Sequence, residues 1–172
     1  MSELRPNGID VEIGGKTYDL LFTLNVIDEC QARFKKPLSE VMKQLTDPYW
    51  MPGTLRTLLT SLINDSLYRS GEQERRTEKE VGGMVTQDMA PELTMKILNA
   101  YLSSVPEADG DTEDGEQEML DVAKLLYIGA IKLGYSETEL FQMTPRKFFL
   151  LFDAFLELNG LKKKEIGIDD LP

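Results

Sequence analysis

The sequence predicts a mainly α-helical fold, a helical bundle that carries a β-hairpin at its N-terminal end. Apolar and polar residues alternate near the N-terminus, on either side of a Gly-Gly pair. Across most of the remaining chain, apolar residues recur at the three- and four-residue spacing of an amphipathic helix. Residues typical of helix caps stand just before several of these stretches, which marks where helices begin.

The predicted hairpin comes first in the chain. Its strands place their apolar residues on one face, namely Ile9, Val11, Ile13, Tyr18, Leu20 and Phe22. Gly14-Gly15 is a two-residue turn signal between the strands. A lone hairpin is only marginally stable in water, so we expect it to pack on helices or to pair with another chain.

Five to seven helices are expected after the hairpin, and Thr23 is the expected N-cap of the first. Apolar spacing places them at residues 24–34, 38–45, 55–70, 91–102, 119–133 and 145–158, with a short turn of helix at 136–143. Apolar residues occupy much of the circumference of the helix at 119–133, so it must pack on more than one neighbour. Residues 72–90 are highly charged and contain Gly82-Gly83, and we expect a mobile loop or a frayed helix there.

An acidic stretch divides the chain. Residues 104–118 carry seven acidic residues, two glycines and one proline, and like charges at this density keep a segment extended. We therefore expect a hairpin and helical body at 9–103, an acidic linker at 104–118, a C-terminal helical unit at 119–161 and a flexible tail at 162–172.

Composition argues against several classes of function. The net charge of −11 disfavours nucleic-acid binding, which needs clustered Lys and Arg, and it disfavours docking on anionic membranes. No stretch approaches the roughly 18 apolar residues of a membrane span. The chain has no histidine, the commonest general base and metal ligand. Its only cysteine, Cys30, lies in a helical pattern and is interpreted as a buried structural thiol.

Two fragments of known motifs fail on their context. Gly15-Lys16-Thr17 copies the end of a P-loop, but Asp10 stands where that motif needs glycine, and a strand follows instead of a helix. Asp109-x-Asp111-x-Glu113 suggests a calcium loop, but Asp114 and Leu120 stand where Gly and Glu are needed. Without histidine no Ser–His or Cys–His pair exists, so we expect no enzyme and neither a cofactor nor a metal site.

The stretch Gly134–Phe149 contains two helix starts in succession. Ser136 with Glu139 three residues later is a capping box. Thr144 is the expected N-cap of the next helix, with Pro145 at its first position. This last helix is more aromatic than the rest of the chain. Core packing explains one of its faces, and a second, exposed face would be a partner-binding surface.

Two segments resemble a known family. The pattern Tyr-Ser-x-x-Glu-apolar-Phe-x-Met-Thr-Pro-x-x-Phe-Phe resembles a segment of the tail assembly chaperones of long-tailed (siphovirus-type) bacteriophages. The N-terminal run V-E-I-G-G-K-T-Y-D-L-L-F-T-L-N is similar to their opening, a short β-hairpin that leads straight into a helix. Each match covers about 15 residues, and the middle of the chain resembles the family only in general character. Phe141 stands where the family often has tryptophan, which keeps that position apolar.

The resemblance implies a function and its partners. Such a chaperone coats the long helical tape-measure protein, keeps it soluble and helps recruit subunits of the tail tube protein. It works in the host bacterial cytoplasm and is expected to be absent from the mature virion. We also expect a homo-oligomer along the client, with the hairpin adding strands between copies.

Eight apolar residues are the candidate partner-binding positions. Methionines in an otherwise polar stretch suit an adaptable surface that holds varied apolar helices, although gap-filling in helical cores explains them as well. The candidates for the client are Leu59, Ile63, Met84 and Met89, and those for the tube-recruiting face are Tyr135, Phe141, Phe148 and Phe149.

Two other functions stay open at this point. One is a structural tail or head-completion subunit that is retained in the virion. The other is a small acidic phage protein that binds a bacterial regulator. Occupancy of purified virions separates the first from a chaperone, and coexpression with tape-measure fragments separates the second.

Overall fold

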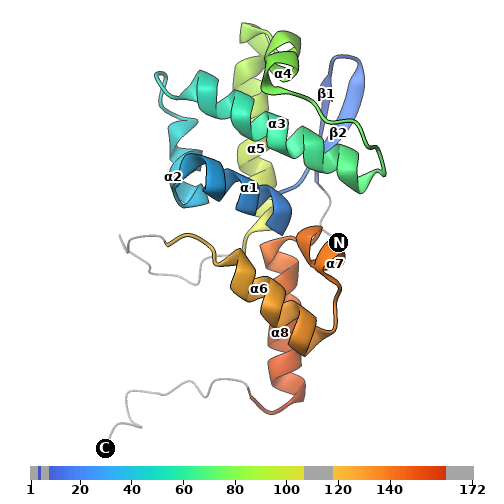
Figure 1. The fold of residues 1–172 in the computed structure, drawn as a ribbon. Coiled ribbons are helices and arrows are strands. Elements are labelled where there is room, and N and C mark those ends of the chain that lie inside the picture. The colour runs from blue at the N-terminus through green and yellow to red at the C-terminus, as the bar shows by residue number, and fades with distance from the viewer. Residues whose placement is uncertain (1–3, 5–7, 107–117, 162–172) are drawn as a thin grey trace, which may run out of the picture.

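One hairpin and eight α-helices form the part of the chain that the computed structural model describes, which is residue 4 and residues 8–106 and 118–161 (Figure 1). The predicted fold class is confirmed: this part is mainly helical, and its two strands form one antiparallel sheet. Residues 107–117 of the expected acidic linker and the expected tail at 162–172 lie outside the described residues.

The hairpin consists of β1 (Ile9–Ile13) and β2 (Lys16–Leu20). Ile13 lies opposite Lys16, so the turn is two residues long. Both turn residues, Gly14 and Gly15, have positive φ angles of 59° and 75°. A two-residue turn with this backbone matches the right-handed twist of the strands, and glycine adopts it without steric cost.

The helical body surrounds one central helix. Its elements are α1 (Leu24–Phe34), α2 (Leu38–Gln44), α3 (Met51–Arg69), α4 (Glu78–Met84), the 3₁₀ turn η1 (Gln87–Met89) and α5 (Ala90–Ser104). The central helix is α3, because β2, α1, α2, α4 and α5 all contact it. Its buried positions therefore extend around most of its circumference and do not form a single stripe.

The expectation of a mobile loop or a frayed helix at residues 72–90 is corrected by α4 and η1. Thr77 and Glu80 form a capping box, in which Glu80 N–H donates to Thr77 Oγ1 (3.3 Å) and Thr77 N–H donates to Glu80 Oε2 (2.7 Å). Val81, one residue further on, is fully buried. The Thr-x-x-Glu signal was present in the sequence, and the high charge around it concealed the short helix.

The C-terminal helices are α6 (Val122–Ile128), the π-helical segment η2 (Gly129–Leu133), α7 (Glu137–Phe141) and α8 (Pro145–Leu158). Both predicted caps are confirmed. Ser136 and Glu139 form a capping box, and Thr144 Oγ1 accepts from Lys147 N–H (3.3 Å). The predicted helix at 119–133 is shorter at its start, and its last turn is π-helical.

The C-terminal unit is docked on the body at one end only. Leu24 N–H donates to Met143 O (2.8 Å), and Arg146 Nε donates to Val105 O (2.9 Å). Leu140 and Phe148 belong to the same buried core as the hairpin and the body. Beyond this junction, η2 packs against α8, and the distal half of α8 extends away from the body (Figure 1).

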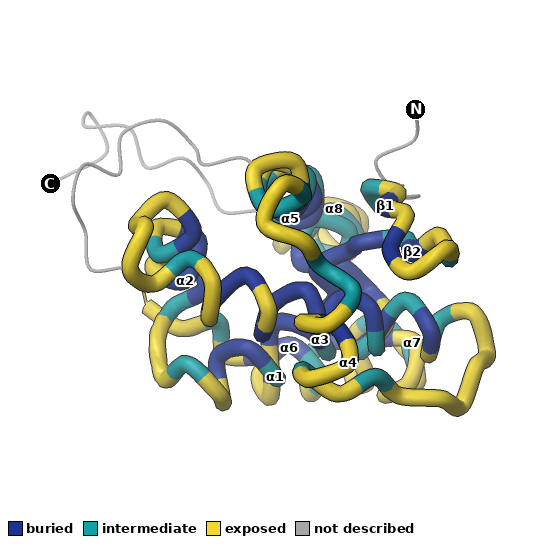
Figure 2. Tube along the Cα trace, turned by 90° about the horizontal axis from the view of Figure 1, so that it is seen from above, coloured by how far each residue is buried: buried dark blue, intermediate teal, exposed yellow. Residues whose placement is uncertain are grey.

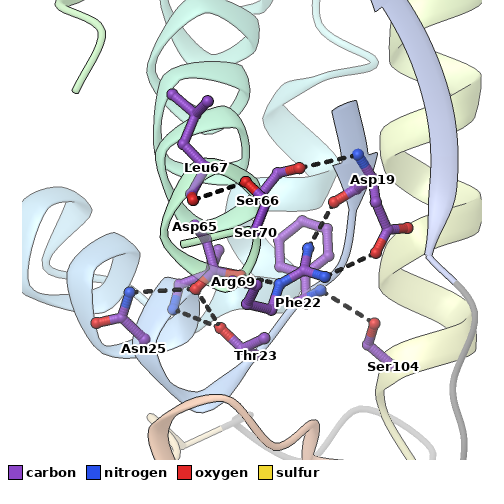
Figure 3. A network of polar contacts seen from close by, with 11 residues as sticks. Asp19, Phe22, Thr23, Asn25, Asp65, Ser66, Leu67, Arg69, Ser70 and Ser104 are labelled. Atoms are coloured by element: carbon purple, nitrogen blue, oxygen red, sulfur yellow. Dashed lines mark hydrogen bonds and ion pairs between the residues drawn. The ribbon is translucent and has the colours of Figure 1, made fainter. Parts of the chain in front are cut away.

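A buried polar network ties the hairpin to the helices (Figure 3). The Asp65 carboxylate accepts from Thr23 Oγ1 (2.9 Å), Asn25 Nδ2 (3.2 Å) and Arg69 Nε (2.8 Å). Arg69 also donates to the Asp19 carboxylate (2.7 Å) and to Asp19 O (2.5 Å). Burial alone would lower the pKa of Arg69, but these two carboxylates outweigh it and raise the pKa. Arg69 therefore stays charged, and it fixes β2 against α3.

Candidate partner-binding surface

The two predicted client-facing residues of α3 are not on the surface. Leu59 and Ile63 are both 0% exposed, so the prediction that they contact a client is wrong for this conformation. The physical reason is the central position of α3, which other elements enclose on several sides. An apolar stripe in the sequence marks a face that is buried, and it does not tell whether the protein's own core or a partner buries it.

The predicted methionines of the polar stretch are half-buried and pack against the core. Met84 lies against the hairpin turn, because a Cβ added to Gly14 would be 2.7 Å from Met84 Sδ. Met84 therefore holds the end of α4 to the hairpin, which is a structural duty. Met89, in η1, also keeps part of its surface open.

An apolar groove lies close to these methionines, between the start of α3, the end of α4 and the start of α5. Its volume is about 380 Å³, and its apolar lining residues are Met51, Pro52, Leu55, Leu59, Val81, Val85 and Ala90. Leu59 contributes to the floor of the groove although it has no exposed surface. The groove therefore stands where the sequence placed client contacts, but mostly different side chains form it.

An exposed aromatic pair precedes this groove in the chain. Tyr49 and Trp50 pack edge to face, with ring centroids 5.0 Å apart, and are 82% and 54% exposed. The next residue, Met51, is part of the groove lining. The sequence showed that this loop holds the only tryptophan, but its two prolines in five residues gave no sign that the aromatic side chains are exposed.

The four predicted residues of the tube-recruiting face divide into two groups. Phe148 is 0% exposed and belongs to the core, so its prediction as a contact residue is wrong. Tyr135, Phe141 and Phe149 are half-buried and pack against the core. Phe149 also lines a pocket of about 310 Å³ at the junction of α1, α5 and α8. Phe148 is the inward-facing member of its pair, which the sequence could not decide.

Three exposed large apolar side chains of the C-terminal unit lie on what we call the distal helix pair, α6–η2 (Val122–Leu133) and the distal half of α8 (Leu150–Leu158). Tyr127, Ile131 and Leu158 are 67%, 62% and 87% exposed. Phe152 and Phe155 are half-buried and stack with ring centroids 6.3 Å apart. Of the fourteen residues of α8, only Pro145 and Phe148 are buried. The sequence predicted more than one neighbour for the helix at 119–133, and the described residues leave one of its faces uncovered.

Charge is distributed unevenly along the chain. Residues 1–121 carry 12 basic and 23 acidic side chains and thus the whole net charge of −11, whereas residues 122–172 carry seven of each. The distal helix pair, with two lysines and two acidic residues, is therefore an extension without net charge on a strongly acidic body. Such a body repels other copies of itself in solution, while the extension carries no such penalty for a partner.

The buried thiol and the acidic groups show no constellation for chemistry in the described residues. Cys30 is fully buried, as expected, and burial raises the pKa of its thiol to about 12, so no thiolate forms at neutral pH. Residues 8–106 and 118–161 contain no cluster of three or more metal-ligand side chains. Within the same residues, none of the helices combines the length and the hydropathy that crossing a membrane requires.

Comparison with known proteins adds no assignment: no protein-family model matches the sequence, and neither the curated proteins nor the solved structures gave a match.

Proposed function

We propose that this protein is an assembly chaperone of the kind that serves the tails of long-tailed bacteriophages. In this proposal it coats helical segments of the tape-measure protein in the host bacterial cytoplasm, keeps them soluble, helps recruit tail tube subunits and is absent from the mature virion. The family resemblance of the two chain ends supports the proposal. The observation that carries it is the distal helix pair, whose apolar side chains remain exposed on a soluble, acidic chain.

The distal helix pair suits a helical client. The segment η2 packs against α8, and the ridges and grooves of neighbouring helices accept the apolar face of a third helix. Tyr127 and Ile131 lie four residues apart on one face of their helix, and both are more than half exposed. Exposed apolar surface of this kind is a risk to a monomer, so a soluble protein that keeps it has a use for it.

The groove beside α3 supports a second contact with the same client. Its lining is mostly apolar, and a volume of about 380 Å³ accepts large apolar side chains of a helix. Arg56 also lines the groove, where its Nε pairs with Glu78 Oε2 (3.5 Å); its side chain is 51% exposed, so an acidic residue beside the client's apolar stripe can share this contact. Trp50 precedes the first residue of α3. Because it is the only tryptophan, its fluorescence would report client binding at this groove.

The acidic body supports the solubilising role. A client that exposes apolar stripes aggregates because its copies attract one another. When copies of this chain cover those stripes, each brings the net charge of −11 to the complex, and the complexes repel one another. The client would thus remain soluble without ATP, by masking and by charge.

Coexpression with tape-measure fragments tests the proposal. We expect wild-type protein to shift fragments of the phage's own tape-measure protein from the insoluble to the soluble fraction and to copurify with them. The triple variant Tyr127→Gln, Ile131→Gln and Leu158→Gln should fail, because it removes three exposed apolar side chains while it leaves the core intact.

A matched control uses three exposed apolar residues of the body. Tyr68, Met95 and Leu102 are 48%, 58% and 61% exposed, and their exchange for Gln should leave solubilisation unchanged. If the control variant and the distal variant solubilise the client equally well, the distal helix pair is not the client-binding surface. If wild-type protein leaves the client insoluble and is found at fixed copy number in purified virions, the protein is a structural subunit instead.

A further inference from the structure

The two edges of the hairpin differ in how they are closed. In an antiparallel pair, alternate residues turn their backbone N–H and C=O groups away from the partner strand. Asp10 and Asp19 lie opposite each other, and the backbone groups of Asp19 are bonded outside the hairpin. The backbone N–H and C=O groups of Asp10 therefore point toward the other edge of the hairpin, the edge of β1. Those of Glu12, two residues further along, point the same way.

Helix α3 closes the edge of β2. Asp19 N–H donates to Ser66 Oγ (3.0 Å), and Arg69 Nη2 donates to Asp19 O (2.5 Å). Both outward backbone groups of Asp19 thus have side-chain partners from one helix. Seen from above, β2 lies between β1 and α3, and β1 forms the outer rim of the hairpin (Figure 2).

The edge of β1 is open by comparison. Helix α5 packs against β1, and among the described residues its Lys96 is the one that hydrogen-bonds this edge, with Nζ donating to Asp10 O (3.1 Å). Both Asp10 and Glu12 are exposed. An unpaired strand edge is a template for another extended chain, and natural proteins usually cover or block such an edge.

The side chains along this edge select the kind of strand that can join it. Asp10 and Glu12 place two carboxylates on the solvent face of β1, and Asp19 lies beside Asp10 on that face. If β1 of a second copy paired here, acidic residues would face acidic residues, which is unfavourable for cross-strand neighbours. A strand with Lys or Arg on the same face gains charge pairing instead.

The opposite face of an added strand would meet the exposed Met95 of α5. Lys96 marks the side of α5 that borders the edge, since its ammonium group reaches Asp10. Met95 and Asn99 lie on the neighbouring exposed part of the helix, and Met95 is 58% exposed. Apolar residues that alternate with basic ones would therefore cover Met95 while the basic residues lie over the carboxylates.

We propose that the open edge of β1, at Asp10 and Glu12, binds an extended peptide segment in which basic and apolar residues alternate, by adding it as a third strand to the hairpin. Backbone hydrogen bonds provide the affinity, and the two carboxylates provide the selectivity. This surface goes beyond the proposed function, because it takes an extended basic segment and the distal helix pair takes helices.

A short peptide of alternating lysine and valine with blocked ends is the probe, and a peptide of alternating glutamate and valine is its comparator. Binding is followed by the amide signals of Asp10 and Glu12 in ¹⁵N-labelled full-length protein. We expect the lysine peptide to shift these two signals and to slow their hydrogen exchange, and the glutamate peptide to have no effect. If neither amide responds to the lysine peptide, the proposal is overturned.

Proline at position 12 distinguishes the contribution of backbone hydrogen bonds to peptide binding from the contribution of charge. Glu12→Pro removes an outward N–H that the hairpin does not use, and proline is tolerated on edge strands with this orientation. We expect it to weaken the lysine peptide by about tenfold relative to Glu12→Ala, which keeps the N–H, a loss of roughly 1.4 kcal/mol. Thr17→Pro, directly opposite on β2, is the matched control and should bind as wild type does.

A charge reversal keeps the test decisive if proline disturbs the fold. Asp10→Lys with Glu12→Lys preserves the backbone and should exchange the preference, so that the glutamate peptide binds and the lysine peptide does not. Equal binding of both peptides to this variant and to wild type would contradict the proposed selectivity. A wild-type dimer in sedimentation that Glu12→Pro dissociates would show that a second copy occupies the edge, which also contradicts the proposal.

Discussion

The side-chain amide of Gln31 makes two hydrogen bonds to the backbone of Leu120, one to its C=O and one to its N–H. Gln31 Nε2 donates to Leu120 O (2.8 Å), and Leu120 N–H donates to Gln31 Oε1 (2.7 Å). One side-chain amide of α1 thus holds the segment that leads into α6. Gln31 is nearly buried, so water cannot easily replace these bonds.

The first prediction concerns this contact. Gln31→Ala should loosen the C-terminal unit by about 1–3 kcal/mol, because it leaves the N–H of Leu120 without a partner and leaves Leu120 O with Val122 N–H as its remaining donor. Native-state hydrogen exchange should show faster exchange in α6 and less change in α3. Gln142→Ala, at an exposed position, is the control. If α6 and α3 lose protection equally, the unit does not open separately from the body.

The second prediction concerns the buried carboxylate under the hairpin. Asp65→Ala should lower the free energy of unfolding by about 3–5 kcal/mol, since Arg69 then remains partly buried without one of its two carboxylates. Urea unfolding measures the change. The i,i+4 pair between the exposed Glu92 and Lys96 is the contrast, and Glu92→Gln should cost less than about 0.5 kcal/mol. Comparable losses for both variants would mean that the buried network does not fix the hairpin.

The third prediction concerns the π-helical segment. A Cβ at Gly129 would lie 2.4 Å from Leu140 Cδ2 and 3.1 Å from Phe148 Cε2, and all three residues are buried. Gly129→Ala should therefore destabilise the protein by about 1–3 kcal/mol through overpacking, despite the helix preference of alanine. Gly83→Ala is the control, because no atom lies within 4 Å of its added Cβ. A stabilised Gly129→Ala variant would contradict this packing.

The fourth prediction is a dependence on pH. Burial raises the pKa of Glu29 above its ordinary value of 4.5, and the nearby Arg75 lowers it only in part. The folded state thus disfavours ionised Glu29 once the pH rises through the ordinary pKa. Glu29→Gln should raise the melting temperature at pH 7 relative to wild type, and this difference should vanish at pH values below 4.5, where both states of the protein hold a protonated Glu29. A melting temperature that falls at pH 7 would show that the Arg75 pair dominates.

Local signals allowed much of the fold to be predicted. The Gly14-Gly15 turn, the Thr23 and Thr144 caps and the Ser136 capping box depend on a few neighbouring residues, and each is present in the structure. These contacts form within one or two turns of chain, so the sequence alone determines them.

The candidate surface could be predicted only in part, because exposure depends on how helices pack. Leu59 and Phe148 lie in apolar patterns just as Ile131 and Phe149 do, but the former are enclosed and the latter are not. The spacing of apolar residues shows which face of a helix must be buried. Tertiary contacts between distant segments decide whether the protein's own core or a partner buries that face. The aromatic surplus of α8 indicated an exposed face, but Phe148 belongs to the core, and Phe149 is half-buried.

Site-specific photocrosslinking tests the central claim most directly. A photoreactive phenylalanine analogue placed at Tyr127, Ile131 or Leu158 should crosslink to a coexpressed tape-measure fragment, since these exposed side chains belong to the proposed binding surface. The same analogue at Tyr68 on the body should give little product. Efficient crosslinks at Tyr68 with none on the distal helix pair would contradict the account.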